Sequence, residues 1–182
     1  RLRELQARDG RLVVVDPRRT ETASVADEHL FIRPGTDALF LAALVHTLFD
    51  EALVRPGRLE PFTDGIHLVR LHVRPFSPEA VASAVGIEAE RIRAVARDFA
   101  TADAAVAYGR MGVSVQEFGG LCQWLITVLN IVTGNLDRAG GAMFTKPAVD
   151  LVANTGPGHL GKYSSRVRGL PAYAGELPVA AL

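Results

Sequence analysis

Apolar residues along the chain fall into short runs typical of buried strands and longer stretches with helical spacing. The run from Leu12 to Val15 ends abruptly at Asp16-Pro17, which predicts a buried strand with a carboxylate at its carboxyl end. The other predicted elements, in chain order, are a strand over 29–33, a helix over 37–53, a short helix from Ser77, a helix over 88–100, a strand over 104–108 and a helix over 116–133.

Local signals support the predicted helices. Thr36 or Asp37 suits the N-cap of the helix over 37–53, and Ser77-Pro78 is typical of a helix start. Gly134 is expected to end the last helix. The helix over 88–100 places on one stripe Ile92, Val95, Ala96 and Phe99. The helix over 116–133 is expected to bury Phe118, Leu121, Leu125, Val128, Leu129 and Val132.

The alternation of strands and helices predicts an α/β fold of Rossmann-like type. We expect a mostly parallel sheet with helices on both faces, with Val13 to Val15 in a central strand. Residues 1–144 are expected to form this domain, and the Gly/Pro-rich residues 145–182 an irregular tail that connects to the next domain. The chain starts at Arg1 inside a helical pattern and ends without a closing element, so it is expected to be a piece of a longer polypeptide.

Composition and charge narrow the classes of partner. The 182 residues are 48% hydrophobic with a formal net charge of zero, and the arginines are scattered, which argues against nucleic-acid binding. The single cysteine, Cys122, excludes a disulfide framework or a cysteine metal cluster within this chain, and it is expected to be a packing residue. No segment is long and apolar enough to span a membrane and no signal peptide is visible, so a cytoplasmic location is expected.

The carboxyl end of the first predicted strand is a candidate nucleotide site, because open α/β sheets bind nucleotides at this edge. Asp16 suits a ribose hydroxyl or a base edge, although Asp-Pro is also a common turn start. Arg18 and Thr20 are candidates for phosphate or sugar contacts, with Arg18 alternatively solvated or paired with Glu21. No Gly-x-Gly-x-x-Gly motif stands beside this strand, so the phosphates of a dinucleotide would have to be bound elsewhere.

Several ordered motifs carry a family resemblance. They are Asp-Pro-Arg-Arg-Thr-Glu-Thr-Ala at 16–23, Ala-Asp-Glu-His at 26–29, Arg-Pro-Gly-Thr-Asp at 33–37, Tyr-Gly-Arg-Met-Gly at 108–112 followed by Gln116, and Leu-Asn-Ile-Val-Thr-Gly-Asn-Leu-Asp-Arg-Ala-Gly-Gly at 129–141. In this order they resemble the dinucleotide-binding half of the molybdopterin oxidoreductases of the dimethyl-sulfoxide reductase superfamily, which includes formate dehydrogenases and nitrate reductases. The resemblance covers about residues 12–144.

The resemblance implies a fragment of a catalytic subunit that binds two molybdopterin guanine dinucleotides around one molybdenum or tungsten. It implies that the metal's protein ligand and any iron–sulfur cluster lie outside this chain, and that the parent enzyme carries out two-electron redox or oxygen-atom transfer. The implied partners are the remaining domains of the parent subunit and an electron-transfer subunit. No catalytic residue and no metal ligand is assigned to this chain itself.

The resemblance also assigns cofactor contacts. Gly35 and Thr36 form a turn and are assigned to the cofactor site. Asp37, which follows this turn, is placed by the resemblance to accept the N1–H and amino donors of guanine. The alternative is that Asp37 is an ordinary N-cap. The glycine-rich loop at Gly109, Arg110 and Met111 is expected to approach the pterin or its phosphates closely. Gln116 is a candidate amide partner for the pterin edge, or a helix-start residue without a ligand.

Two other classes of function remain open at this point. One is a stand-alone, non-catalytic nucleotide-binding module of Rossmann type. The other is a structural or interaction domain whose Gly-rich tail docks on a partner. Neither accounts for the order of the later motifs.

Overall fold

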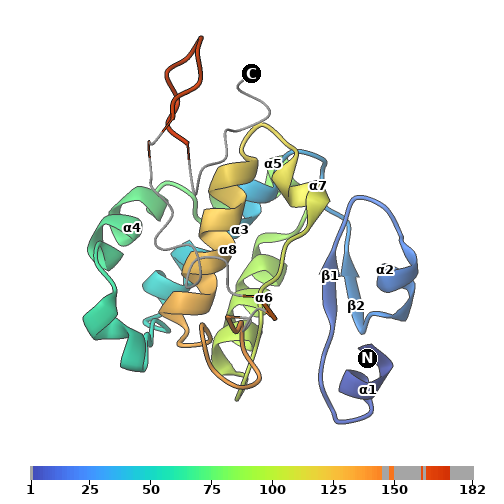
Figure 1. The fold of residues 1–182 in the computed structure, drawn as a ribbon. Helices are drawn as coiled ribbons and strands as arrows, with labels where there is room; N and C mark the ends of the chain where they lie inside the picture. Colours follow the sequence, from blue (N-terminus) through green and yellow to red (C-terminus); the bar gives the residue numbers. More distant parts are fainter. Residues whose placement is uncertain (1, 145–147, 150–160, 162, 173–182) are drawn as a thin grey trace. The chain divides into compact units, whose positions relative to one another are not determined.

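The computed structural model of the chain describes residues 2–144, 148–149, 161 and 163–172. Two compact units are present, residues 1–143 and residues 144–182. In the second unit, residues 163–172 form a turn closed by hydrogen bonds from Ser165 N to Leu170 O and from Ala172 N to Tyr163 O, both 2.8 Å. All candidate cofactor residues lie in the first unit, whose elements are labelled in Figure 1.

A small parallel sheet follows the first helix, α1 (Leu2–Gln6). Strand β1 (Val13–Val15) pairs with β2 (Glu28–Leu30), with Val14 opposite His29. The helix α2 (Glu21–Val25) connects the two strands, as a parallel pair requires a crossover. This confirms an α/β arrangement with parallel pairing.

The sheet is smaller than the sequence predicts. Within the described residues it has two strands, so the expectation that β1 is a central strand is wrong there. Residues 104–108, predicted as a strand, do not form one: residue 104 lies in a bend, and residues 105–108 have no regular secondary structure. Their recorded backbone hydrogen bonds go to asparagine side chains instead of a neighbouring strand, as described below.

The hydrophobic core is built around α3 (Asp37–Asp50), which is apolar on most of its sides. This helix packs against α4 (Ile66–Val73), α5 (Pro78–Val85), α6 (Ala89–Thr101) and α8 (Gly119–Val132). The helix predicted over 37–53 is therefore confirmed, although it ends at Asp50. No helix in the described part of the chain is long and apolar enough to cross a bilayer.

The predicted signals of the next helices are confirmed. The Ser77 hydroxyl accepts a hydrogen bond from Ala80 N at 3.2 Å, and Pro78 occupies the first turn of α5. In α6, Ile92 and Ala96 are buried, whereas Val95 and Phe99 are partly buried. The segment between α3 and α4, rich in proline and glycine, contains the 3-10 helix η1 (Gly57–Phe62).

The last helix differs from its prediction at its start. A separate short helix, α7 (Met111–Ser114), comes first, and α8 begins only at Gly119. A Cβ atom at Gly119 would lie 2.0 Å from Ser114 O, so the chain turns tightly there. Phe118 is consequently outside the helix and 51% exposed, and Leu121 is 45% exposed, so both were wrongly predicted to be buried. Cys122 and Ile126 are buried with the other four predicted residues.

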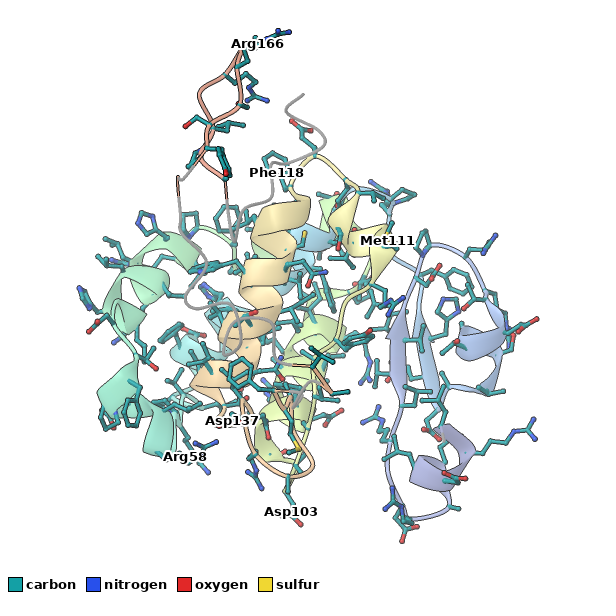
Figure 2. All side chains as sticks on the ribbon, viewed as in Figure 1. Arg58, Asp103, Met111, Phe118, Asp137 and Arg166 are labelled. Atoms are coloured by element: carbon teal, nitrogen blue, oxygen red, sulfur yellow. The ribbon has the colours of Figure 1, made fainter. Side chains whose placement is uncertain are left out.

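Gly134 ends α8 with a φ of 69°, as predicted, and its N–H donates to Ile131 O at 2.9 Å. A Cβ at this position would lie 2.9 Å from Arg55 O. Beyond it, Arg58 donates to the carbonyl oxygens of Leu136 and Asp137, and Figure 2 labels Arg58 and Asp137. These bonds connect the turn after α8 to η1.

An ion-pair network joins the end of α3 to α6. Glu51 accepts hydrogen bonds from Arg97 at 2.7 and 2.8 Å and from Arg93 at 3.5 Å. The bonds from Arg97 lower the pKa of the Glu51 carboxyl despite its partial burial. Because the carboxyl pKa is lower in the folded state, the network stabilises the fold above the ordinary pKa of Glu, and this stabilisation is lost as the pH falls through the lowered pKa.

We therefore expect Glu51→Gln to lower the free energy of unfolding by about 1 kcal/mol near neutral pH. At acid pH, as the carboxylate of the unchanged protein becomes protonated, the difference should shrink. Urea unfolding of both proteins at neutral and at acid pH measures this. Equal losses at both values would contradict an electrostatic role for Glu51.

Candidate cofactor-binding site

Two residues that are 79 positions apart in the sequence meet at the start of α3. Gln116 Nε2 donates a hydrogen bond to Asp37 Oδ2 at 2.9 Å. Asp37 is the first residue of the helix, and Thr36 occupies the N-cap position after the turn at Gly35, whose φ is 81°. The Thr36 hydroxyl donates to Arg33 O and makes no capping bond. The alternative that Asp37 is the N-cap is therefore wrong.

The orientation of the Gln116 amide follows from its partners. Its nitrogen contacts two acceptors, Asp37 Oδ2 and Gly112 O, the latter at 3.2 Å, so the opposite orientation would place oxygen against oxygen. The amide oxygen is buried and has no hydrogen-bond partner among the described residues. An unpaired buried acceptor costs roughly 1–3 kcal/mol, which a ligand donor at this position would offset.

The glycine-rich loop before Gln116 lies directly against α8. A Cβ at Gly109 would come within 2.5 Å of Ile126 Cδ1, so a larger residue there would require the end of the Ile126 side chain to move. Gln123 of α8 donates to Ser114 Oγ at 2.9 Å. Met111, labelled in Figure 2 on α7, is exposed. The Arg110 guanidinium is also exposed and donates to the Tyr108 hydroxyl at 3.0 Å, a neutral partner that leaves its charge available to an anion.

The candidate residues at the end of β1 form a separate group. Asp16 Oδ1 accepts from Arg18 N at 2.7 Å, which is the turn anticipated as an alternative, and Asp16 N donates to Leu30 O. The Thr20 hydroxyl caps α2 by accepting from Ala23 N. Arg18 is exposed and makes no ion pair with Glu21 within the described residues. No hydrogen bond or ion pair described in the structure joins this group to Asp37 and Gln116.

Sequence reasoning missed three polar residues that hold the backbone near these groups. His29 Nε2 donates to Asp16 O at 2.9 Å, which fixes the position of its proton, and its ring lies 4.0 Å from that of Phe31. Asn130 and Asn135 bind the segment that leads into Gly109. An asparagine in the apolar sequence of α8 was the available signal, since a buried amide needs partners.

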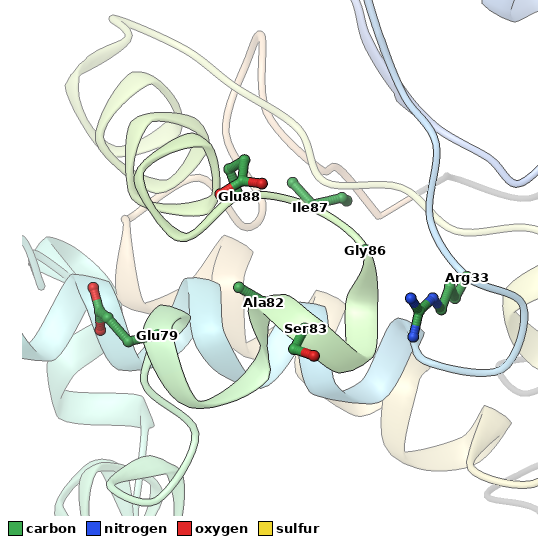
Figure 3. A pocket seen from close by; sticks show the side chains of 7 residues that line it. All are labelled: Arg33, Glu79, Ala82, Ser83, Gly86, Ile87 and Glu88. Atoms are coloured by element: carbon green, nitrogen blue, oxygen red, sulfur yellow. The ribbon is translucent and has the colours of Figure 1, made fainter.

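The surface hollows of the described residues lie elsewhere. The hollow in Figure 3, about 450 Å³, is lined by residues around the end of α5 and by Arg33. A second, of about 910 Å³, lies among the end of α3, η1 and α4. Neither contains a candidate cofactor residue. The Asp37–Gln116 contact, and not a cavity, therefore defines the candidate site.

The donor set of the candidate site suits an organic ligand. A carboxylate and an amide are complementary to the N1–H and amino group of guanine. Among the described residues, no group of three or more His, Cys, Asp or Glu is arranged for a metal ion. Cys122 is fully buried; burial, with a contribution from Asp37, raises the pKa of its thiol, as for a packing residue.

Known proteins are similar to most of this chain in sequence and fold. Formate dehydrogenase H of Escherichia coli is 33% identical over 128 residues, which are 70% of this chain and 18% of that protein. The molybdopterin-containing subunit of thiosulfate reductase from Salmonella typhimurium is 32% identical over 145 residues, 79% of this chain and 19% of that subunit. The structure of acetylene hydratase from Pelobacter acetylenicus matches with a TM-score of 0.71 and 28% identity, covering 78% of this chain and 19% of the hydratase.

No protein-family model matches the chain. These relatives nevertheless belong to one family, and the chain belongs with them to the molybdopterin oxidoreductases of the dimethyl-sulfoxide reductase superfamily. It spans about a fifth of the length of these relatives.

Proposed function

We propose that this chain is a cofactor-binding segment of a larger molybdopterin oxidoreductase, and that it binds one guanine dinucleotide tail of the cofactor. The contact between Asp37 and Gln116 carries the proposal, because it joins two of the family-like motifs at a half-buried polar site where the Gln116 oxygen has no hydrogen-bond partner among the described residues. The cofactor supplies the redox chemistry when bound, and the residues of this chain supply binding and orientation.

Each candidate residue has a role in this proposal. Asp37 accepts the N1–H and amino donors of guanine, and Gln116 lies beside it as an amide partner for the ligand. Arg110 offers a positive charge to the phosphates, and Gly109 and Met111 bring the loop close to the pterin. Asp16, Arg18 and Thr20 contact sugar or phosphate. Gly35 and Thr36 form the turn that presents Asp37.

The Rossmann-like sheet is part of the same proposal. A parallel strand can pair on both edges, but β1 pairs on one edge only within the described residues, and residues 104–108 make no backbone pairing with a strand there. A two-stranded sheet is marginal on its own. We infer that other parts of the larger protein complete the sheet.

The whole protein is proposed to catalyse two-electron redox or oxygen-atom transfer at molybdenum or tungsten held by two such dinucleotides. The proposal also includes an iron–sulfur cluster and an electron-transfer subunit, both outside this chain. It places the whole protein in the cytoplasm. The match to long oxidoreductases over 70–79% of the chain favours this function over a stand-alone nucleotide-binding module.

Nucleotide analysis tests the proposed function. The full-length protein that contains this segment is purified and hydrolysed in acid, and the released nucleotides are separated by chromatography. Guanine nucleotide, without adenine or cytosine nucleotide, is the expected result. A protein that carries the metal but releases no guanine nucleotide would overturn the proposal.

Metal analysis of the 182-residue chain by itself gives a second expected result. Because its described residues offer no metal-ligand set and Cys122 is buried, the purified chain should contain no molybdenum or tungsten and show no oxidoreductase activity. Elemental analysis by mass spectrometry measures this. Either metal at one atom per chain would place the metal site inside this segment.

A further inference from the structure

The segment over 104–108 is held by two asparagine side chains. Asn130 Oδ1 accepts from Ala107 N at 3.1 Å, and Asn130 Nδ2 donates to Ala107 O at 2.9 Å. Two residues earlier in the segment, Ala105 N donates to Asn135 Oδ1 at 3.2 Å. Alternate residues of a strand point their N–H groups to the same edge, so these amides bind the segment where a neighbouring strand would bind it.

Both asparagines are themselves fixed. Asn130 is 2% exposed, and its Nδ2 also donates to Ile126 O at 2.8 Å within α8. Asn135 is equally buried and donates to the Thr133 hydroxyl at 3.0 Å. The turn after α8 adds bonds from Asn135 N and Leu136 N to Asn130 O, at 2.7 and 2.9 Å. The amides therefore form a rigid support.

This support lies immediately before the glycine-rich loop. Ala107 is two residues from Gly109, which lies close to the Ile126 side chain of α8. The loop continues through α7 to Gln116, whose amide reaches Asp37. Asn130 and Ile126 are one turn apart on α8, so a single helix fixes both the segment and the start of the loop.

We infer that Asn130, assisted by Asn135, is a positioning residue of the cofactor site. The Asn130 side chain makes the hydrogen bonds to Ala107 that a neighbouring strand would otherwise make. These bonds fix where the loop of residues 109–112 begins and thus how Gln116 meets Asp37. The role of this loop in binding rests on the proposed function. The positioning itself rests on the hydrogen bonds alone, so the two can be tested apart.

The test compares Asn130→Ala with Leu129→Ala in the full-length protein. Leu129 is the neighbouring residue of α8, is 3% exposed and contributes apolar packing without binding the segment. Asn135→Ala, which removes one bond to the segment, at Ala105, together with the bond to the Thr133 hydroxyl, serves as a milder variant if Asn130→Ala does not fold. Two quantities are measured for each variant: the rate of hydrogen exchange at the amides of Ala107, Val113 and Ser114, and the amount of guanine dinucleotide that the protein retains. The variants are compared under conditions in which their free energies of unfolding are equal.

We expect Asn130→Ala to increase the rate of hydrogen exchange at these amides by on the order of tenfold, since two hydrogen bonds to Ala107 are removed. The rate at which the protein loses the dinucleotide should increase by a similar factor. Leu129→Ala should change neither. Equal effects of the two variants at matched stability would reduce Asn130 to a packing residue and overturn the inference. Faster exchange in a protein whose unchanged form releases no guanine nucleotide would support the positioning and overturn the proposed function instead.

Discussion

Replacement of Asp37 by asparagine is expected to lower the affinity for the guanine dinucleotide by roughly tenfold to a hundredfold. The change places an amide NH2 opposite the guanine donors and removes the charge from the hydrogen bond, a loss of about 1.5–3 kcal/mol. Helix α3 should remain intact, because Thr36 and not Asp37 occupies its N-cap position. The loss of a negative charge from the first turn costs at most about 1 kcal/mol.

The experiment measures dinucleotide content of the full-length variant after gel filtration, together with its thermal unfolding. Asp50→Asn is the matched control, since it makes the same chemical change at the other end of the same helix. Asp50 is exposed, and its Oδ2 lies 3.5 Å from Nη1 of Arg93. The control should retain the dinucleotide. Normal content in Asp37→Asn at unchanged stability would show that Asp37 does not bind guanine and serves only to hold Gln116.

Replacement of Leu48 by alanine is expected to cost about 2–5 kcal/mol of folding free energy. Leu48 is fully buried on α3, the helix against which α4, α5, α6 and α8 pack, so neighbouring helices can close the resulting cavity only in part. Leu71→Ala is the control: Leu71 is on α4 and 55% exposed, and a change there should cost less than about 0.5 kcal/mol.

Urea unfolding of the 182-residue chain, monitored by circular dichroism, measures both variants. A loss of less than about 1 kcal/mol for Leu48→Ala would contradict the placement of α3 at the centre of the core. A similar loss for both leucines would indicate that α4 is covered by other parts of the protein.

Features that depend on neighbouring residues were predictable from the sequence. The valine run, the Ser77-Pro78 start and the Gly134 stop all act through local backbone geometry, and the structure confirms each. The parallel pair formed by β1 and β2 belongs with them, because its short crossover is continuous in the sequence. The order of the motifs likewise revealed the family.

Contacts between distant segments were decided only by the tertiary structure. Periodicity placed Phe118 and Leu121 on the buried side of one long helix, but the chain turns tightly where Gly119 approaches Ser114, so α8 starts later and Phe118 lies outside it. Leu121, in the first turn of α8, is exposed as well. The segment over 104–108 has the composition of a strand, yet a strand requires a partner, and Asn130 provides the hydrogen bonds instead.

The same division holds for the candidate site. The sequence by itself determined that Asp37 opens a helix after a glycine turn and that Gln116 follows a glycine-rich loop, because both features are local. Only the fold decided that these two residues meet across 79 positions, that Thr36 takes the N-cap and that the Gln116 oxygen has no hydrogen-bond partner in the described part of the chain. A side-chain hydrogen bond depends on the relative placement of α3 and α8, which core packing fixes and no local pattern records.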